Sequence, residues 1–137
     1  MHITPKPVNT APWSVDSSWQ LNDYKQFLAS NVFEGMKRVI TNGTAKQLLT
    51  VTKKHNNYYF YAKTGTINEA GGSESNSRRL IVAIASKDLT QAQNIGNAKV
   101  YSLFFVIDNN KDFNWALISN IISANVQSSS FQKYFAN

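Results

Sequence analysis

The chain contains no cysteine, and its only histidines are His2 and His55. Without cysteine it can form neither a disulfide bond nor a thiolate metal site. Two histidines do not complete an ordinary zinc site unless several carboxylates join them. We therefore expect no metal ion, and no pattern in the sequence points to another cofactor.

Long apolar runs are also missing, although 42% of the 137 residues are hydrophobic. A helix that spans a bilayer needs about 20 consecutive apolar residues. Residues 1–22 have no apolar centre of the kind that a signal peptide carries. The sequence as given thus predicts a single domain with its own core, and neither a signal nor a transmembrane segment.

Positive charge is in excess but is not concentrated. The net charge is +6, and the basic residues form only short pairs at 37–38, 53–54 and 78–79. A basic arm that binds nucleic acid would be a continuous run. We interpret most of this charge as solvated surface and expect no nucleic-acid partner.

All three prolines lie in the first 12 residues, and Trp13 and Trp19 follow closely. This segment has neither helical nor strand periodicity. We predict an extended arm or connection over 1–21, anchored by the two tryptophans, and a folded part over 22–137.

Helical spacing marks the next segment. Asn22 or Asp23 can cap a first helix, and Ser30-Asn31 is a candidate break and new cap. Gly43 stands where a glycine often ends a helix. Gly35, inside the second helix, costs roughly 1 kcal/mol relative to alanine, which indicates close packing against a neighbour. The apolar face of that helix contains Phe33, Met36 and Ile40.

Further turns are marked by polar caps. Thr44 can cap a short turn over 45–49, and Asn110 or Asp112 can cap a C-terminal helix. Ser128-Ser129-Ser130 should interrupt that helix before 131–135.

Three segments have strand composition. They cover about 58–66, 79–86 and 100–108, and the second is apolar enough to be covered on both faces. With helices before them and a helix after them, they predict an α+β fold around a three-stranded antiparallel sheet.

The first strand changes character along its length. It begins with Tyr58-Tyr59-Phe60-Tyr61 and ends with Lys63-Thr64-Gly65-Thr66. A glycine in a strand often marks a place where a ligand or another backbone comes close. An open strand edge can also pair with an extended peptide. The cation and hydroxyls therefore predict a site for a peptide-like ligand with a carboxylate, although an exposed strand end would have the same sequence.

Two linked motifs resemble one family. The stretch 33–40, followed by Asn42-Gly43-Thr44-Ala45, is similar to the helix and Gly-Thr-Ala turn in the transpeptidase domain of penicillin-binding proteins. In that family the turn precedes the Lys-Thr-Gly-Thr strand, here residues 63–66. The resemblance covers roughly 24–135 and implies part of a β-lactamase/transpeptidase-like fold.

The resemblance also implies roles for residues. Lys63 would supply positive charge in the cleft, and the hydroxyls of Thr64 and Thr66 would bind the carboxylate of a peptidoglycan stem peptide or a β-lactam. Gly65 belongs to the same substrate-binding strand. The backbone N–H of Thr66 would form half of the oxyanion hole. By this resemblance, Lys63 and Thr66 are the catalytic candidates.

The chain departs from the family before the strand. The family's Ser-x-x-Lys nucleophile motif and its Ser-x-Asn motif should precede residue 63, and neither does. Ser130-Phe131-Gln132-Lys133 and Ser123-Ala124-Asn125 match by letters but come after it, so we interpret them as polar helix surface. Covalent catalysis needs a serine next to a base. Alone, the chain should not acylate, and we interpret it as a fragment of such a domain.

The resemblance has further implications. The parent would act at the cell envelope, on the periplasmic face of the inner membrane. In the family two more strands lie beside the last strand, so an open 100–108 edge should self-associate or be covered by residues 10–20. The alternative function is a small non-catalytic α+β module that binds peptide or nucleic acid, with bases stacked on residues 58–61.

Overall fold

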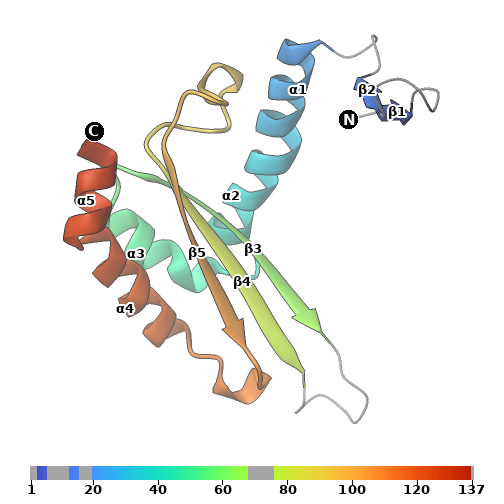
Figure 1. Cartoon of the computed structure of the whole chain (residues 1–137). Coiled ribbons are helices and arrows are strands. Elements are labelled where there is room, and N and C mark those ends of the chain that lie inside the picture. The colour runs from blue at the N-terminus through green and yellow to red at the C-terminus, as the bar shows by residue number, and fades with distance from the viewer. Residues whose placement is uncertain (1–2, 6–12, 16–19, 68–75, 137) are drawn as a thin grey trace.

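The computed structural model describes residues 3–5, 13–15, 20–67 and 76–136. Its element order is α+β, with helices first, then a three-stranded antiparallel sheet, then C-terminal helices (Figure 1). This order confirms the predicted fold class. Near the N-terminus, β1 (Ile3–Pro5) pairs with β2 (Trp13–Val15), so the predicted arm contains a small antiparallel pair that its sequence did not indicate. Trp19 lies outside the described residues.

A single continuous helical path follows the arm. It runs through α1 (Leu21–Phe27), a π-helical segment (Leu28–Phe33) and α2 (Glu34–Thr41). The predicted break at Ser30-Asn31 is therefore wrong, because a wide turn accommodates these residues and Glu34 N–H donates to Ala29 O. The predicted cap was also misplaced, since the helix begins after Gln20, whose N–H donates to Asp23 Oδ2 at 3.3 Å.

The segment after α2 is more helical than the sequence predicted. A 3₁₀ turn over Lys46–Leu48 leads into α3 (Leu49–Lys54). The residue before the turn is Ala45, so Thr44 is not its cap. Burial explains the extension, because Leu48 and Val51 both lie in the main core.

The sheet has the order β3-β4-β5, with β4 in the centre. The strands are β3 (Tyr59–Ile67), β4 (Ser77–Ala85) and β5 (Val100–Ile107). All pairs are antiparallel, with Lys63 opposite Ile81 and Leu80 opposite Phe105. The three predicted strands are thus present, shifted by one or two residues at some ends. β3 and β5 form the two edges.

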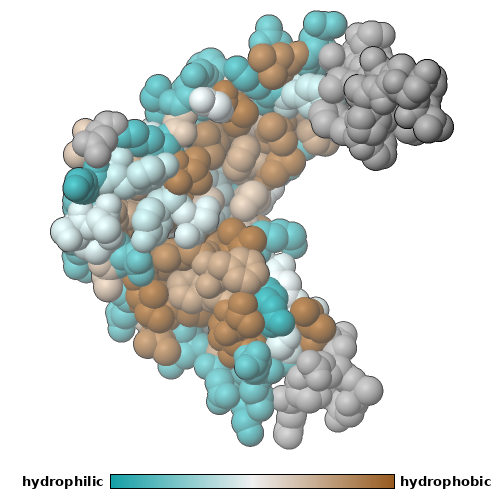
Figure 2. All heavy atoms as spheres, in the orientation of Figure 1, coloured by the Kyte–Doolittle hydropathy of each residue, from teal (hydrophilic) through white to brown (hydrophobic). Residues whose placement is uncertain are grey.

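Helices pack on both faces of the sheet, as Figure 1 shows. On one face, Leu80, Val82 and Ile84 of β4 form the main core with Ile118 and Ile122. On the other, the buried Tyr61 contacts a smaller cluster that includes Phe33, whose ring meets the Tyr61 ring edge-on at 5.5 Å. Figure 2 shows that the molecule is crescent-shaped, hollowed between the α1–α2 helix and the far end of the sheet.

Two helices follow the sheet. They are α4 (Trp115–Val126), capped by the Asn114 side chain, and α5 (Ser129–Ala136). The predicted caps Asn110 and Asp112 lie instead in a short 3₁₀ turn. The predicted interruption is confirmed, because Ser128 Oγ donates to Asn125 O at 2.7 Å and accepts from Phe131 N–H at 3.3 Å. One hydroxyl thus ends α4 and caps α5.

Tyr61 anchors the loop between β4 and β5. Its hydroxyl accepts a hydrogen bond from Leu89 N–H at 2.7 Å and donates one to Asp88 Oδ1 at 3.2 Å. Burial raises the pKa of Tyr61 far above its ordinary value of 10.0, so the hydroxyl stays neutral and can donate. The loop is therefore fixed to β3, the strand with the candidate site.

We expect Tyr61→Phe to lower the free energy of unfolding by about 1–3 kcal/mol, because Leu89 N–H would stay buried without its acceptor. Urea denaturation measures this. Tyr59→Phe is the matched control, since Tyr59 is 43% exposed and its loss of a hydroxyl should change little. Equal losses in the two variants would contradict the role of Tyr61.

His55 links α3 to α4, because its Nε2 lies 2.9 Å from Ser123 Oγ. Burial, with a smaller contribution from Lys54, lowers the pKa of His55 below its ordinary value of 6.5. The folded chain therefore resists protonation of this ring more than the unfolded chain does.

This shift predicts a pH dependence of stability. As the pH falls through 6.5 toward the lower folded pKa, the unfolded chain takes up a proton that the folded chain does not, so stability decreases. Urea midpoints measured between about pH 8 and about pH 5 should record the decrease. His55→Gln should remove this contribution, and an unchanged pH profile in that variant would count against it.

Candidate functional site

β3 passes from the core to an open rim. Phe60, Tyr61 and Ala62 are buried, whereas Lys63, Gly65 and Thr66 are exposed and Thr64 is half-buried. The predicted site residues thus lie together on an edge strand, at the end where the helices no longer cover it. A ligand could reach this end of β3 without unfolding any element.

The direction of the backbone groups along β3 follows from one hydrogen bond. Ser86 N–H donates to Lys99 O at 3.0 Å, so even-numbered residues of β4 direct their backbone groups toward β5. Odd-numbered residues of β4 then face β3. Since Arg79 lies opposite Gly65, the odd-numbered residues of β3 are the ones that bond to β4.

The backbone N–H and C=O groups of the even-numbered residues of β3 therefore point away from β4. The N–H and C=O groups of Thr64 and Thr66 point to the open edge. A side-chain contact supports this direction, because Lys63 Nζ donates a hydrogen bond to Thr64 O at 3.1 Å, so this carbonyl group is not bonded to β4 alone. Among the described residues, the outward Thr66 N–H has no strand partner, and the Lys63 ammonium lies at Thr64 O on the same edge. An extended anionic ligand can use both groups.

The Gly43-Thr44-Ala45 turn contacts this edge directly. Thr44 Oγ1 and Thr64 Oγ1 lie 2.8 Å apart, within hydrogen-bond distance. Ala45 is fully buried, and its N–H donates to Val39 O at 2.9 Å. The turn therefore joins the end of α2 to β3. The sequence placed Thr44 in a cap and in the family-like Gly-Thr-Ala turn, but it did not predict that Thr44 belongs to the site.

Gly43 is required by space rather than by an unusual dihedral angle. A Cβ at this position would lie 2.9 Å from Val39 Cα and 3.0 Å from Arg38 O. The predicted helix-end position is right, but its φ is not positive. Gly35 shows the reverse, since a Cβ there would meet nothing within 4 Å. The prediction of close packing at Gly35 is therefore wrong, because that side of α2 is open.

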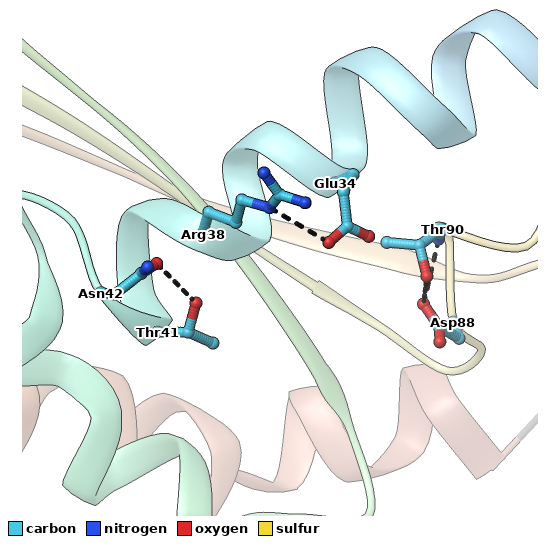
Figure 3. Close-up of polar contacts among 6 residues, drawn as sticks. All are labelled: Glu34, Arg38, Thr41, Asn42, Asp88 and Thr90. Atoms are coloured by element: carbon cyan, nitrogen blue, oxygen red, sulfur yellow. Dashed lines mark hydrogen bonds and ion pairs between the residues drawn. The ribbon is translucent and has the colours of Figure 1, made fainter.

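A shallow groove of about 460 Å³ lies between α2 and β3. At its rim, Arg38 Nε lies 3.4 Å from Glu34 Oε1 along the helix (Figure 3). The groove holds Lys63 and Thr64, while Gly65 and Thr66 lie beyond it on the same strand. Its lining also includes Gly35, Gly43 and Thr44. Sequence reasoning did not include Arg38 in the site.

The aromatic residues 58–61 do not form a stacking surface. Phe60 and Tyr61 are buried, and the Tyr58 ring packs edge-on against Phe131 at 5.1 Å. Only Tyr59 of the four is exposed. The expectation that this row could stack bases is therefore wrong, because the core needs the rings.

The later letter matches lie on the C-terminal helices. Ser123 contacts His55, and Ser130 Oγ lies 3.4 Å from Ser128 Oγ. Ser123 and His55 have the spacing of a nucleophile and a base. However, no other side chain in the described part of the chain holds the second ring nitrogen of His55, and neither residue lines the groove.

The described residues contain no group of three or more side chains that could bind a metal ion. None of their helices is long and apolar enough to cross a membrane. What the site offers is one ammonium, two threonine hydroxyls and edge backbone groups. These can bind a carboxylate and an extended backbone.

Gly43→Ala should destabilise the fold by about 1–3 kcal/mol, because the new methyl group would overlap backbone atoms of α2. Gly35→Ala is the matched control, and we expect it to stabilise the helix by up to about 1 kcal/mol. Urea denaturation of both variants measures the difference. Equal effects would show that the turn is not held tightly against α2.

No protein family model, no curated protein sequence and no solved structure matches this chain.

Proposed function

We propose that the chain carries the substrate-binding part of a transpeptidase domain of the penicillin-binding-protein type, which cross-links peptidoglycan through an acyl-serine intermediate. The observation that carries the proposal is the contact between the Gly-Thr-Ala turn and the Lys-Thr-Gly-Thr edge strand, with Thr44 and Thr64 hydroxyl oxygens 2.8 Å apart. Two motifs that are 18 residues apart in sequence, counted from Ala45 to Lys63, form one rim. We further propose that the fold is part of the β-lactamase/transpeptidase-like architecture.

In this function each rim residue has a role. Lys63 attracts the carboxylate of a peptidoglycan stem peptide or of a β-lactam. The hydroxyls of Thr64 and Thr66 bind that carboxylate, and Thr44 orients the Thr64 hydroxyl. The Thr66 N–H, which faces the open edge, serves as one donor of an oxyanion hole. Gly65 leaves the strand bare where the acyl donor lies.

The proposal leaves the nucleophile outside this sequence. Neither Ser-x-x-Lys nor Ser-x-Asn precedes Lys63, and the oxyanion hole would need a second N–H from the nucleophilic serine. The chain alone therefore binds its ligand reversibly and does not acylate. The complete domain would act at the cell envelope.

Solution NMR of the chain, titrated with benzylpenicillin or a peptide ending in D-Ala-D-Ala, tests this function. We expect the amide resonances of Thr64, Gly65 and Thr66 to shift at millimolar concentrations of the ligand. Lys63→Gln and Thr66→Val should weaken binding by about tenfold each, because each removes a contact of about 1.4 kcal/mol to the carboxylate. Lys53→Gln, at an exposed position of α3, is the matched control and should leave binding unchanged.

Two results would contradict the proposal. One is no shift on β3 at millimolar ligand. The other is a stable covalent adduct of the chain with a fluorescent penicillin, since that would require a nucleophile within these 137 residues. A gene segment that encodes Ser-x-x-Lys in frame upstream would support the proposal independently.

A further inference from the structure

β5 is the second edge of the sheet, and its outer side is open. Lys99 O accepts a hydrogen bond from Ser86 N–H, so the backbone groups of the odd-numbered residues of β5 bond to β4. The backbone groups of the even-numbered residues point away from β4. No strand among the described residues pairs with this side. One outward group is used, because the Tyr134 hydroxyl donates to Val100 O at 3.1 Å. The outward-facing residues are Val100, Ser102, Phe104 and Val106.

The same residues expose apolar side chains. Val100 is 39% exposed, Phe104 62% and Val106 50%. Their odd-numbered neighbours instead face α4 and α5, and Leu103 and Phe105 pack against the main core. Hydrophobic side chains gather over this part of the visible surface in Figure 2.

This edge has none of the usual protection against pairing. From Val100 to Ile107 it contains no charged residue, no proline and no glycine. Natural edge strands commonly carry an inward charge, a proline or a bulge that prevents association with another chain. A regular, uncharged edge of this length is a template for strand addition.

We propose that β5 pairs antiparallel with β5 of a second copy of this chain, which joins two three-stranded sheets into one sheet across a two-fold axis. With the axis at Phe104, the two Phe104 residues lie opposite each other, and Ser102 lies opposite Val106 of the other copy. The outward backbone groups of one copy then lie opposite the outward backbone groups of the other. The exposed rings gain a cross-strand aromatic contact.

Charge favours a second copy in this orientation. β5 is preceded by Lys99 and followed by Asp108. Antiparallel pairing of identical strands brings the basic end of one near the acidic end of the other, whereas parallel pairing would bring like charges together. The opposite edge of the sheet does not suit self-pairing over its whole length, because Phe60 and Ala62 are buried there.

The described strands of the chain's own arm do not pair with this edge. β2 pairs with β1, not with β5. The expectation that residues 10–20 cover the last strand is thus wrong for 13–15, and the other residues of that range up to 19 lie outside the described part. The inference concerns the chain as given and rests on its open edge, whereas the proposed function would place two further strands at this edge in a complete domain.

Sedimentation velocity over a concentration series tests the dimer. We expect the mass to approach twice the 15.4 kDa of one chain as concentration rises. Phe104→Lys should weaken association by at least about tenfold, because it places two like charges opposite each other on the axis. Val106→Lys should act in the same direction. Leu117→Lys, at a 56% exposed position of α4, is the matched control and should still dimerise.

Amide hydrogen exchange followed by NMR gives a second readout that does not depend on a variant. The amides of Ser102, Phe104 and Val106 should become protected as concentration rises. Those of Tyr101, Leu103 and Phe105 should be protected at every concentration, because β4 already binds them.

Several outcomes would overturn the proposal. One is a monomer at all concentrations, with the even-numbered amides exchanging freely. Another is dissociation by Leu117→Lys but not by Phe104→Lys. Assemblies that grow without a limiting mass would also overturn it, because the two-fold pairing closes. A dimer whose even-numbered amides stay unprotected would place the interface elsewhere.

Discussion

The pairing of β4 with a strand on each side is the constraint on which the rest of the structure depends. Leu80, Val82 and Ile84 are fully or almost fully buried in this strand. Because successive backbone groups alternate in direction, the fixed register of β4 determines which residues of its two neighbours face outward. A slip of one residue would turn the backbone groups of Thr64 and Thr66 toward β4. It would also move the Phe104 side chain onto the face of the sheet that forms the main core.

The two edges that result differ in chemistry. Along β3, the helices cover the aromatic half and leave Lys63 to Thr66 open beside the Gly43-Thr44-Ala45 turn. Along β5, exposure alternates over the whole strand without any charge. One edge is therefore polar, local and joined to a groove, whereas the other is apolar and regular. The first suits a small anionic ligand, and the second suits another strand.

Much of this architecture could be predicted from local patterns. The three strands and the break at Ser128 follow from apolar runs and polar punctuation, which act over a few residues. The exposed end of β3 follows from its change in composition. The contact between Thr44 and Thr64 could not be derived in this way, because it depends on how α2 packs on the sheet. The aromatic composition around Tyr58 did not show whether these rings are exposed or buried, because an aromatic residue fits a core as well as a surface.

Glycine and helix interruptions were the least predictable features. Gly35 and Gly43 have the same side chain, yet only Gly43 lies against neighbouring atoms. Ser30 and Asn31 have the composition of a break, but burial of the adjoining Ala29 and the packing of Phe33 keep the chain helical. Tertiary packing thus overrides local preference at these positions.

The wide turn over Leu28–Phe33 has a consequence for how this helix can change over evolution. Such turns accommodate one residue more than a regular helix does. Removing a single residue from an ordinary helix rotates everything beyond it by about 100° and misaligns its two buried faces. Here the loss of one residue would instead convert the segment to regular α-helix and leave the flanking helices in phase. This is therefore the position in the path from Leu21 to Thr41 at which relatives of different length can share the same packing.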